Sequence, residues 1–158
     1  MDKSPLLPPD DDARATAREL LRTARSAVLA VCTGEGRAPL QSRIAFALGP
    51  GGDCLSLISS LAQHHQALKD TPVCSLLIGD PPDKGDALAF PRITLTARAE
   101  FLPRSAHAEL RGPYLERHPK ARLYVDFADF GFVRFLPDSA FLNAGFGKAF
   151  NLSPDDLA

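Results

Sequence analysis

The stretch Leu57-Ile-Ser-Ser-Leu-Ala-Gln-His-His-Gln-Ala-Leu68 decides how the rest of this chain is organised. An apolar, strand-like run ends there in two hydroxyl side chains, Ser59 and Ser60, and a short helical segment follows with His64 and His65 in its first turns. Hydroxyls beside the free N–H groups of a helix start are typical of an anion site, and two imidazoles add further donors. The same pattern also fits an ordinary capped surface helix with two solvated histidines, so both interpretations stay open at this point.

Length and composition indicate one compact globular domain. A chain of 158 residues can bury a substantial core, and 45% hydrophobic with 23% charged residues is ordinary for such a domain. A net charge of -1 and a pI near 6.4 argue against nucleic acid or an anionic membrane as the partner. A small anionic ligand stays possible, because local basic clusters are enough to bind one.

The cysteines and the apolar runs indicate in which cellular compartment the protein is expected. Cys32, Cys54 and Cys74 lie in apolar runs without C-x-x-C spacing, which predicts reduced, buried thiols and gives no reason to expect a metal site. The first residues show no export signal, and no apolar run reaches the roughly 18 residues that a membrane span needs. We therefore expect a cytoplasmic protein that does not use a membrane.

Periodicity predicts mainly β structure with flanking helices. Strands are expected at 27–33, 38–48, 54–59, 73–78 and 92–101, followed by a closing hairpin of 130–136 and 141–144 over a turn at 137–139. Amphipathic helices are expected at 13–25 and 105–118, and the arginines of the first are interpreted as a solvated face. Residues 1–10 are expected to be a flexible lead-in, 11–150 the domain, and 151–158 a loose tail. Several antiparallel strands interrupted by helices suggest a small barrel with helices packed outside.

The order of these features resembles a known superfamily. Arg43-Ile-Ala-Phe46 in one strand, Ile58-Ser-Ser60 closing the next, and Pro91-Arg-Ile-Thr-Leu95 further on are similar to the pyridoxamine 5′-phosphate oxidase-like FMN-binding split barrels. Later pieces, such as His118-Pro119 and Gly145-Phe-Gly-Lys-Ala149, resemble the haem-utilisation (HugZ/HutZ-like) branch of that superfamily. The similarity covers about residues 14 to 150.

The resemblance implies a homodimer of two six-stranded antiparallel barrels with FMN bound at the interface. The residues that it places at the cofactor are Arg43, Ile44, Ala45, Phe46, Ser59, Ser60, His64, His65, Arg92 and Lys148. The Arg43 fork suits a phosphate group, whereas His64 and His65 stand where the oxidase has an Arg-Lys pair and would form a weaker charge clamp. Arg92 stands where the oxidase presents a Gln to the flavin ring.

Each of these residues also has an ordinary structural interpretation. Arg43 and Arg92 fit polar strand faces, and Lys148 fits a glycine-flanked loop cation. Asp126 and Asp129 are interpreted as structural partners of arginines rather than as a catalytic pair.

Three functions follow from the resemblance and remain open. The first is an FMN-dependent oxidoreductase acting on an unidentified small molecule, with no catalytic residue assigned; the arginine-rich C-terminal segment of the true oxidase is missing. The second is haem binding, which ranks lower because the family's haem ligand lies in the C-terminal segment and no histidine follows His118, unless His64, His65, His107 or His118 substitutes. The third is a flavin-binding module without turnover.

Overall fold

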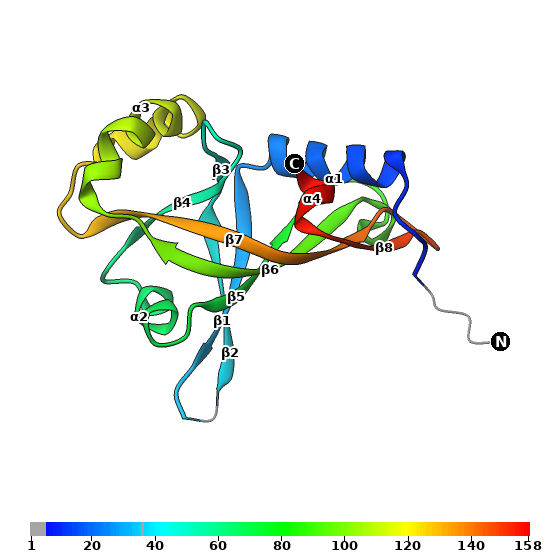
Figure 1. The fold of residues 1–158 in the computed structure, drawn as a ribbon, viewed down its shortest axis with the longest axis horizontal. Helices are drawn as coiled ribbons and strands as arrows, with labels where there is room; N and C mark the ends of the chain where they lie inside the picture. Colours follow the sequence, from blue (N-terminus) through cyan, green and yellow to red (C-terminus); the bar gives the residue numbers. More distant parts are fainter. Residues whose placement is uncertain (1–5, 36) are drawn as a thin grey trace.

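The described part of the chain forms a single antiparallel sheet of eight strands flanked by helices (Figure 1). The computed structural model describes residues 6–35 and 37–158. The sheet order is β2-β1-β5-β6-β7-β4-β3, with β8 added beside β7. The strands are β1 (Ser26–Thr33), β2 (Ala38–Ala45), β3 (Ala47–Leu48), β4 (Cys54–Ser59), β5 (Val73–Ile78), β6 (Arg92–Phe101), β7 (Phe130–Asn143) and β8 (Ala149–Leu152). The predicted mainly β class with flanking helices is confirmed.

The sheet curls on itself because two consecutive strands of the chain, β2 and β3, lie at opposite ends of the sheet. β2 pairs with β1, whereas β3 pairs with β4 at the far end of the strand order. Only Phe46 separates β2 from β3. The strand expected at 38–48 is therefore divided at a corner. This division and the additional strand β8 give eight strands, two more than the six-stranded barrel that the resemblance implied.

β7 is one long strand, so the predicted closing hairpin is wrong. Its first half pairs with β4 and its second half with β8, while β6 runs along the other edge. The register against β6 shifts between Thr96 and Ala97, which leaves Asp138 as an extra residue beside Pro137. Proline is tolerated because residues 136–139 pair with neither β4 nor β8, so that edge of the ladder needs no N–H donor there.

Helices pack on the outside of the barrel. They are α1 (Asp11–Thr23), α2 (Gln63–Asp70), α3 (His107–Arg117) and α4 (Pro154–Leu157), with 3-10 turns at Ala87–Ala89, Arg104–Ala106 and Pro119–Leu123. The Asp10 carboxylate caps α1 by accepting from the Ala13 N–H at 2.7 Å, and the apolar stripe of α1 is buried against the barrel. α1 begins and ends two residues before the predicted bounds.

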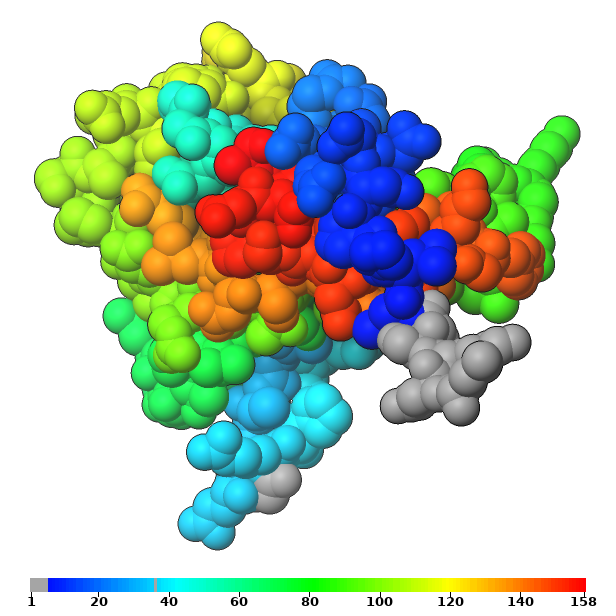
Figure 2. Space-filling model, turned by 45° about the vertical axis from the view of Figure 1, so that its right-hand side comes forward, coloured from blue at the N-terminus to red at the C-terminus, as the bar shows by residue number. Residues whose placement is uncertain are grey.

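The C-terminal residues 151–158 are not the loose tail that was expected. They complete β8 and then form α4, whose Asp156 carboxylate accepts from Arg14 Nε at 2.7 Å. Figure 2 shows this segment packed against α1. Of the predicted lead-in, residues 1–5 lie outside the described residues, whereas Leu7 donates from its N–H to the Ala149 carbonyl at 2.8 Å.

Most of the apolar side chains fill the barrel and the space under α1 and α2, and a smaller cluster lies under α3. Cys54 and Cys74 are buried as predicted. Cys32 is exposed, against expectation, because it lies on the outer side of the β1–β2 hairpin that projects from the body of the molecule (Figures 1 and 2). Among the helices of the described residues, none has both the length and the apolarity that crossing a membrane would require.

Candidate functional site

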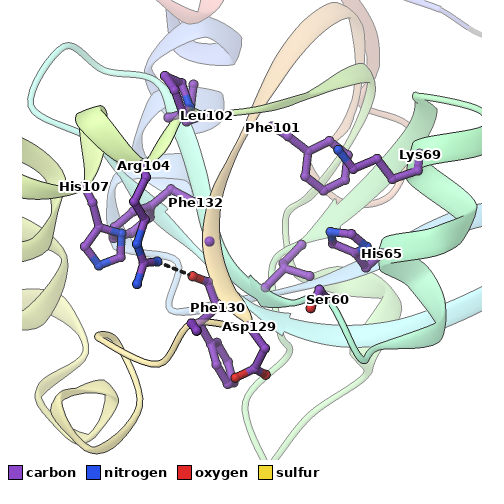
Figure 3. Close-up of a pocket in the computed structure, with 14 residues that line it drawn as sticks. Ser60, His65, Lys69, Phe101, Leu102, Arg104, His107, Asp129, Phe130 and Phe132 are labelled. Atoms are coloured by element: carbon purple, nitrogen blue, oxygen red, sulfur yellow. Dashed lines mark hydrogen bonds between the residues drawn. The ribbon is translucent and has the colours of Figure 1, made fainter.

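A cavity of about 260 Å³ lies where the ends of β4 and β6 meet the start of β7, beside α2 (Figure 3). Its walls include three aromatic rings, Phe101, Phe130 and Phe132. Its polar lining comes from four separate segments of the chain: Ser60, His65, Lys69, Arg104, His107 and Asp129. Apolar walls with a few convergent polar groups are typical of a small-molecule site.

On one side of the cavity, His65 and Lys69 of α2 flank the ring of Phe101 (Figure 3). The ring of His65 meets that of Phe101 edge-on, with centroids 4.8 Å apart, and Lys69 Nζ lies 4.2 Å from the Phe101 centroid. Burial lowers the pKa of His65, and the Lys69 cation lowers that pKa further. Among the described residues, none forms a hydrogen bond with the His65 ring, so its neutral nitrogens are free for a ligand.

Arg104 and His107 form the opposite side of the cavity (Figure 3). Arg104 Nη1 donates to the Phe130 carbonyl at 2.7 Å, which fixes the guanidinium at the rim. The His107 ring packs on Phe132 with centroids 5.0 Å apart, and its Nε2 atom is buried without a hydrogen-bond partner in the described part of the chain. Asp126 Oδ1 lies 3.9 Å from that nitrogen, so the carboxylate of Asp126 is a charged neighbour of His107 on this side of the cavity.

Ser59 and Ser60, the predicted phosphate hydroxyls, differ in their surroundings. Ser59 Oγ donates to Asp129 Oδ2 at 2.6 Å and accepts from the Leu61 N–H at 3.1 Å. Its proton is therefore committed to a carboxylate, whose negative charge also disfavours a phosphate at this point. Ser60 keeps an exposed side chain at the cavity, where its N–H donates to the Asp129 carbonyl at 2.7 Å.

His64 lies outside the cavity lining and is engaged elsewhere. Its Nδ1 atom is 3.0 Å from Ser42 Oγ, within hydrogen-bonding distance. Burial lowers the pKa of His64, and the neighbouring His65 adds to that effect. The two histidines thus differ, since His65 faces the cavity and His64 holds α2 to β2.

Arg43 and Arg92 lie on the outer face of the sheet. Arg43 is in one cross-strand row with Val28, Leu77 and Thr94, and the adjacent row through Ser42 is buried in the barrel. Arg43 therefore points away from His64, and its side chain has no hydrogen-bond or ion-pair partner in the ranges described. Arg92 lies on the same face, but its strand β6 is three strand spacings, about 14 Å, from the strand β2 that carries Arg43. Arg92 Nη1 donates to the Leu88 carbonyl at 3.2 Å.

The remaining predicted residues are also placed away from the cavity. Lys148 lies at the opposite end of the barrel, in the turn between β7 and β8. Ile44 and Phe46 are 6% and 0% exposed, so only their backbone can meet a ligand. The Ala45 carbonyl accepts from Ser56 Oγ at 2.6 Å.

Of the ten predicted site residues, the structure brings Ser60 and His65 together at this cavity. The sequence analysis did not name Lys69, Arg104 or the aromatic walls, and it named His107 only as one of four alternative haem ligands. Lys69 carried a signal, because it follows His65 by four residues and so shares its helix face. No local pattern placed Arg104 or His107 at this cavity, because their approach depends on how β6 leads into α3.

The acidic side chains near the cavity have protein partners. Asp126 accepts from Arg111 Nε at 2.8 Å and from Arg111 Nη2 at 2.6 Å, which confirms its interpretation as a structural partner of an arginine. Asp129 pairs with Ser59 instead of an arginine. Across the described ranges, no cluster of three or more His, Cys, Asp or Glu side chains is arranged to hold a metal ion.

We expect the stability of the fold to decrease as the pH falls below about 6.5, because His118 must lose a proton to fold. His118 Nε2 contacts the Phe46 carbonyl at 2.8 Å. Burial lowers the pKa of His118, and that carbonyl raises it in part, while Arg117 and Arg25 lower it. The unfolded chain therefore binds more protons than the folded chain between the folded pKa and about 6.5.

Urea unfolding midpoints at pH 7.5 and at pH 5.5 measure this dependence. The variant His118→Gln keeps a hydrogen-bond donor but does not titrate, so its midpoint should fall less than that of the parent protein. Equal decreases in both proteins would contradict the assignment to His118.

Comparison with known proteins gives one family and several relatives. A family model described as CREG, beta-barrel matches residues 8–157. The heme oxygenase HOZ, a chloroplastic protein of Arabidopsis thaliana, is 38% identical over 112 residues, which are 71% of this chain and 34% of that protein. The chain thus spans about a third of the length of this curated relative.

Three solved structures share the fold. A heme binding protein from Mycobacterium smegmatis is 25% identical, with a TM-score of 0.82 over 96% of this chain and 61% of that chain. HutZ, the heme storage protein from Vibrio cholerae, is 22% identical, with a TM-score of 0.69 over 85% and 94%. A member of the pyridoxinephosphate oxidase family from Clostridium acetobutylicum is 16% identical, with a TM-score of 0.72 over 95% and 100%. The last two show the fold alone.

Proposed function

Because this chain belongs to the CREG β-barrel family, we propose that it binds haem in the cavity beside α2. The predicted split-barrel fold and the predicted nearness to the haem-utilisation branch are both confirmed. The plant relative is a longer protein, so its activity is not part of the proposal.

The residues of the cavity fit such a ligand. Haem iron takes an axial histidine, and His65 offers an imidazole that is neutral near pH 7 and unpaired in the described structure. Lys69 and Arg104 stand at the rim on opposite sides, where they can pair with the two carboxylates of haem. Bound haem would supply redox chemistry at its iron. The single observation that carries the proposal is this free imidazole at a cavity that has aromatic walls and a cation on each side.

A titration of the purified protein with haem tests the proposal. We expect a sharp Soret band that saturates at one haem per chain, with the spectrum of a histidine-ligated iron. A broad band that grows without saturation would mean that haem only associates with the surface, and the proposal would fail.

A second candidate is FMN binding on the outer face of the sheet, with an oxidoreductase reaction on an unidentified small molecule. It is supported by the Arg43 guanidinium, which has no partner in the described ranges, and by the fold shared with the pyridoxinephosphate oxidase family. Arg92 lies on the same face. A phosphate bound by the planar fork of Arg43 would leave the flavin ring lying along the exposed strands.

The variant Arg43→Ala should weaken FMN binding at least tenfold, or by about 1.4 kcal/mol, because it removes the bidentate phosphate contact. Quenching of flavin fluorescence during titration measures the affinity. Arg98→Ala is the matched control, since Arg98 is an exposed arginine elsewhere on the same face of β6. Equal affinities of the parent protein and Arg43→Ala would remove this arginine from the site.

A second copy of the chain would complete the binding site for either ligand, so we also propose a homodimer. The outer face exposes apolar side chains in the row of Arg43, with Leu77 at 41% and Phe141 at 42%. The cavity beside α2 is smaller than the roughly 300–1,000 Å³ of most cofactor sites, which leaves part of a planar ligand to other walls. Sedimentation equilibrium with and without haem would show the dimer or rule it out.

A further inference from the structure

A second hollow, distant from the cavity beside α2, lies between α1, the turn before β4, the bend of β7 and α4. This apolar cavity has a volume of about 560 Å³, within the range of small-molecule sites. Its apolar lining includes Leu21, Leu48, Cys54, Phe135, Leu136 and Leu157, and Arg18, Arg22 and Asp53 also line it. Aliphatic side chains dominate this lining, with one aromatic ring, so it suits a flexible alkyl chain better than a flat ring system.

A polar hollow adjoins the apolar cavity and shares Arg22 and Leu48 with it. This arginine hollow has a volume of about 480 Å³ and is lined by Arg22, Arg25 and Arg117 with a single acidic residue, Glu116. The shared residues make the two hollows one continuous surface, apolar at one end and basic at the other.

The arginines of this surface are held in place by backbone contacts. Arg25 Nη1 donates to the Arg117 carbonyl at 2.9 Å, and Arg117 Nη2 donates to the carbonyls of Thr23 and Ala24, the latter at 2.8 Å. These contacts leave both positive charges uncompensated, because a carbonyl is neutral. Two guanidinium groups that line the same hollow and are fixed by backbone contacts are pre-organised for an anion.

The acidic neighbours cancel only part of this charge. Glu19 pairs with Arg22 at 2.7 Å, which leaves Arg25 and Arg117 as the charges of the hollow, and Asp53 forms an ion pair with Arg134 at 3.5 Å. Within the described ranges, Arg18 and Arg25 have no acidic partner. The basic end of the surface therefore carries excess positive charge. The arginines of the predicted helix at 13–25 were interpreted as a solvated face, and in the structure Arg22 and Arg25 adjoin this cavity.

We propose that this surface binds an amphiphilic carboxylate, a fatty acid or a related acyl anion, with its alkyl chain in the apolar cavity and its carboxylate in the arginine hollow. The proposal is independent of haem or FMN binding, because it uses none of the residues of those sites. Each buried methylene is worth roughly a fourfold gain in affinity, so chain length is the most direct test.

The experiment is displacement of a dansyl-labelled undecanoic acid, which is convenient because the chain has no tryptophan. We expect octanoate, decanoate and dodecanoate to displace the probe with affinities that rise about fourfold per methylene. Dodecanol should bind at least tenfold more weakly than dodecanoate, because it lacks the charge. Affinity that does not depend on chain length, or dodecanol that binds as well as dodecanoate, would overturn the proposal.

Two variants locate the site on this surface. Arg25→Ala should weaken dodecanoate at least fivefold while leaving dodecanol unchanged, and Leu157→Glu should abolish displacement by placing a negative charge in the apolar cavity. Arg98→Ala is the matched control and should change neither affinity. If the Leu157→Glu protein does not fold, the chain-length series and the Arg25→Ala variant still test the proposal. Equal changes of dodecanoate affinity in Arg25→Ala and Arg98→Ala would contradict the assignment of the site.

Discussion

Replacing Phe46 with alanine should lower the free energy of unfolding by about 3 to 5 kcal/mol, the largest effect that we expect of any single substitution. The Phe46 ring is 0% exposed and packs in the main core of the barrel. Its removal would leave a cavity at the corner between β2 and β3, where the chain crosses from one end of the sheet to the other.

The backbone of Phe46 makes the corner resistant to collapse. Its N–H donates to the Arg25 carbonyl at 3.0 Å, and its carbonyl contacts His118 Nε2 at 2.8 Å. Because these contacts hold the main chain in place, the surrounding residues cannot move inward to fill the space left by the ring. We therefore expect the loss of unfolding free energy to lie near the upper end of the range of about 3 to 5 kcal/mol.

Urea denaturation, with the free energy extrapolated to water, measures this effect. Phe146→Ala is the matched control, since Phe146 is 71% exposed and its loss should change stability by less than about 0.5 kcal/mol. Should Phe46→Ala fail to fold, Phe46→Leu should cost roughly 1 to 2 kcal/mol instead. A loss below about 1 kcal/mol for the alanine variant would mean that the ring does not fill the core as described.

Replacing His65 with alanine should lower haem affinity at least about 100-fold, because loss of a metal ligand exceeds the 10- to 100-fold that loss of a supporting residue costs. The Soret band of the remaining complex should shift to that of iron without a histidine ligand. Free imidazole should restore the parent spectrum, since it can enter the space that the side chain leaves.

His64→Ala is the control for this variant, because it removes the neighbouring imidazole, which contacts Ser42 rather than the cavity. It should leave the Soret band in place. A His65→Ala protein with an unchanged band would contradict the assignment of the ligand. In that case His107→Ala tests the other histidine that lines the cavity.

Sequence patterns predicted the regular strands well, for a physical reason. The bounds of β6 match the prediction because its apolar and polar residues alternate, and alternation reflects one buried face. Those of β5 match because it is a short apolar run between Pro72 and Gly79. Pro137 was taken as a turn signal, yet β7 continues through it because no strand pairs with that edge. Whether a proline ends a strand depends on neighbours far along the chain.

The candidate site was harder to predict, because it is assembled from four distant segments. Ser60 and His65 were found through their local pattern at a strand end and a helix start. Arg104 and His107 join them only because β6 turns away from the barrel into α3. Arg43 was expected near His64, but alternation along β2 places Arg43 and Ser42 on opposite faces, and it is Ser42 that meets His64.

The one-residue corner at Phe46 also sets where the length of this chain can vary among relatives. Side chains alternate between the inside and the outside of the barrel along each strand. One residue gained or lost between β2 and β3 would therefore exchange the inward-facing and outward-facing residues of one of these two strands. The polar loop at 79–86 has no such constraint, because its length does not set the phase of either neighbouring strand. Insertions and deletions should therefore collect in that loop and spare the corner.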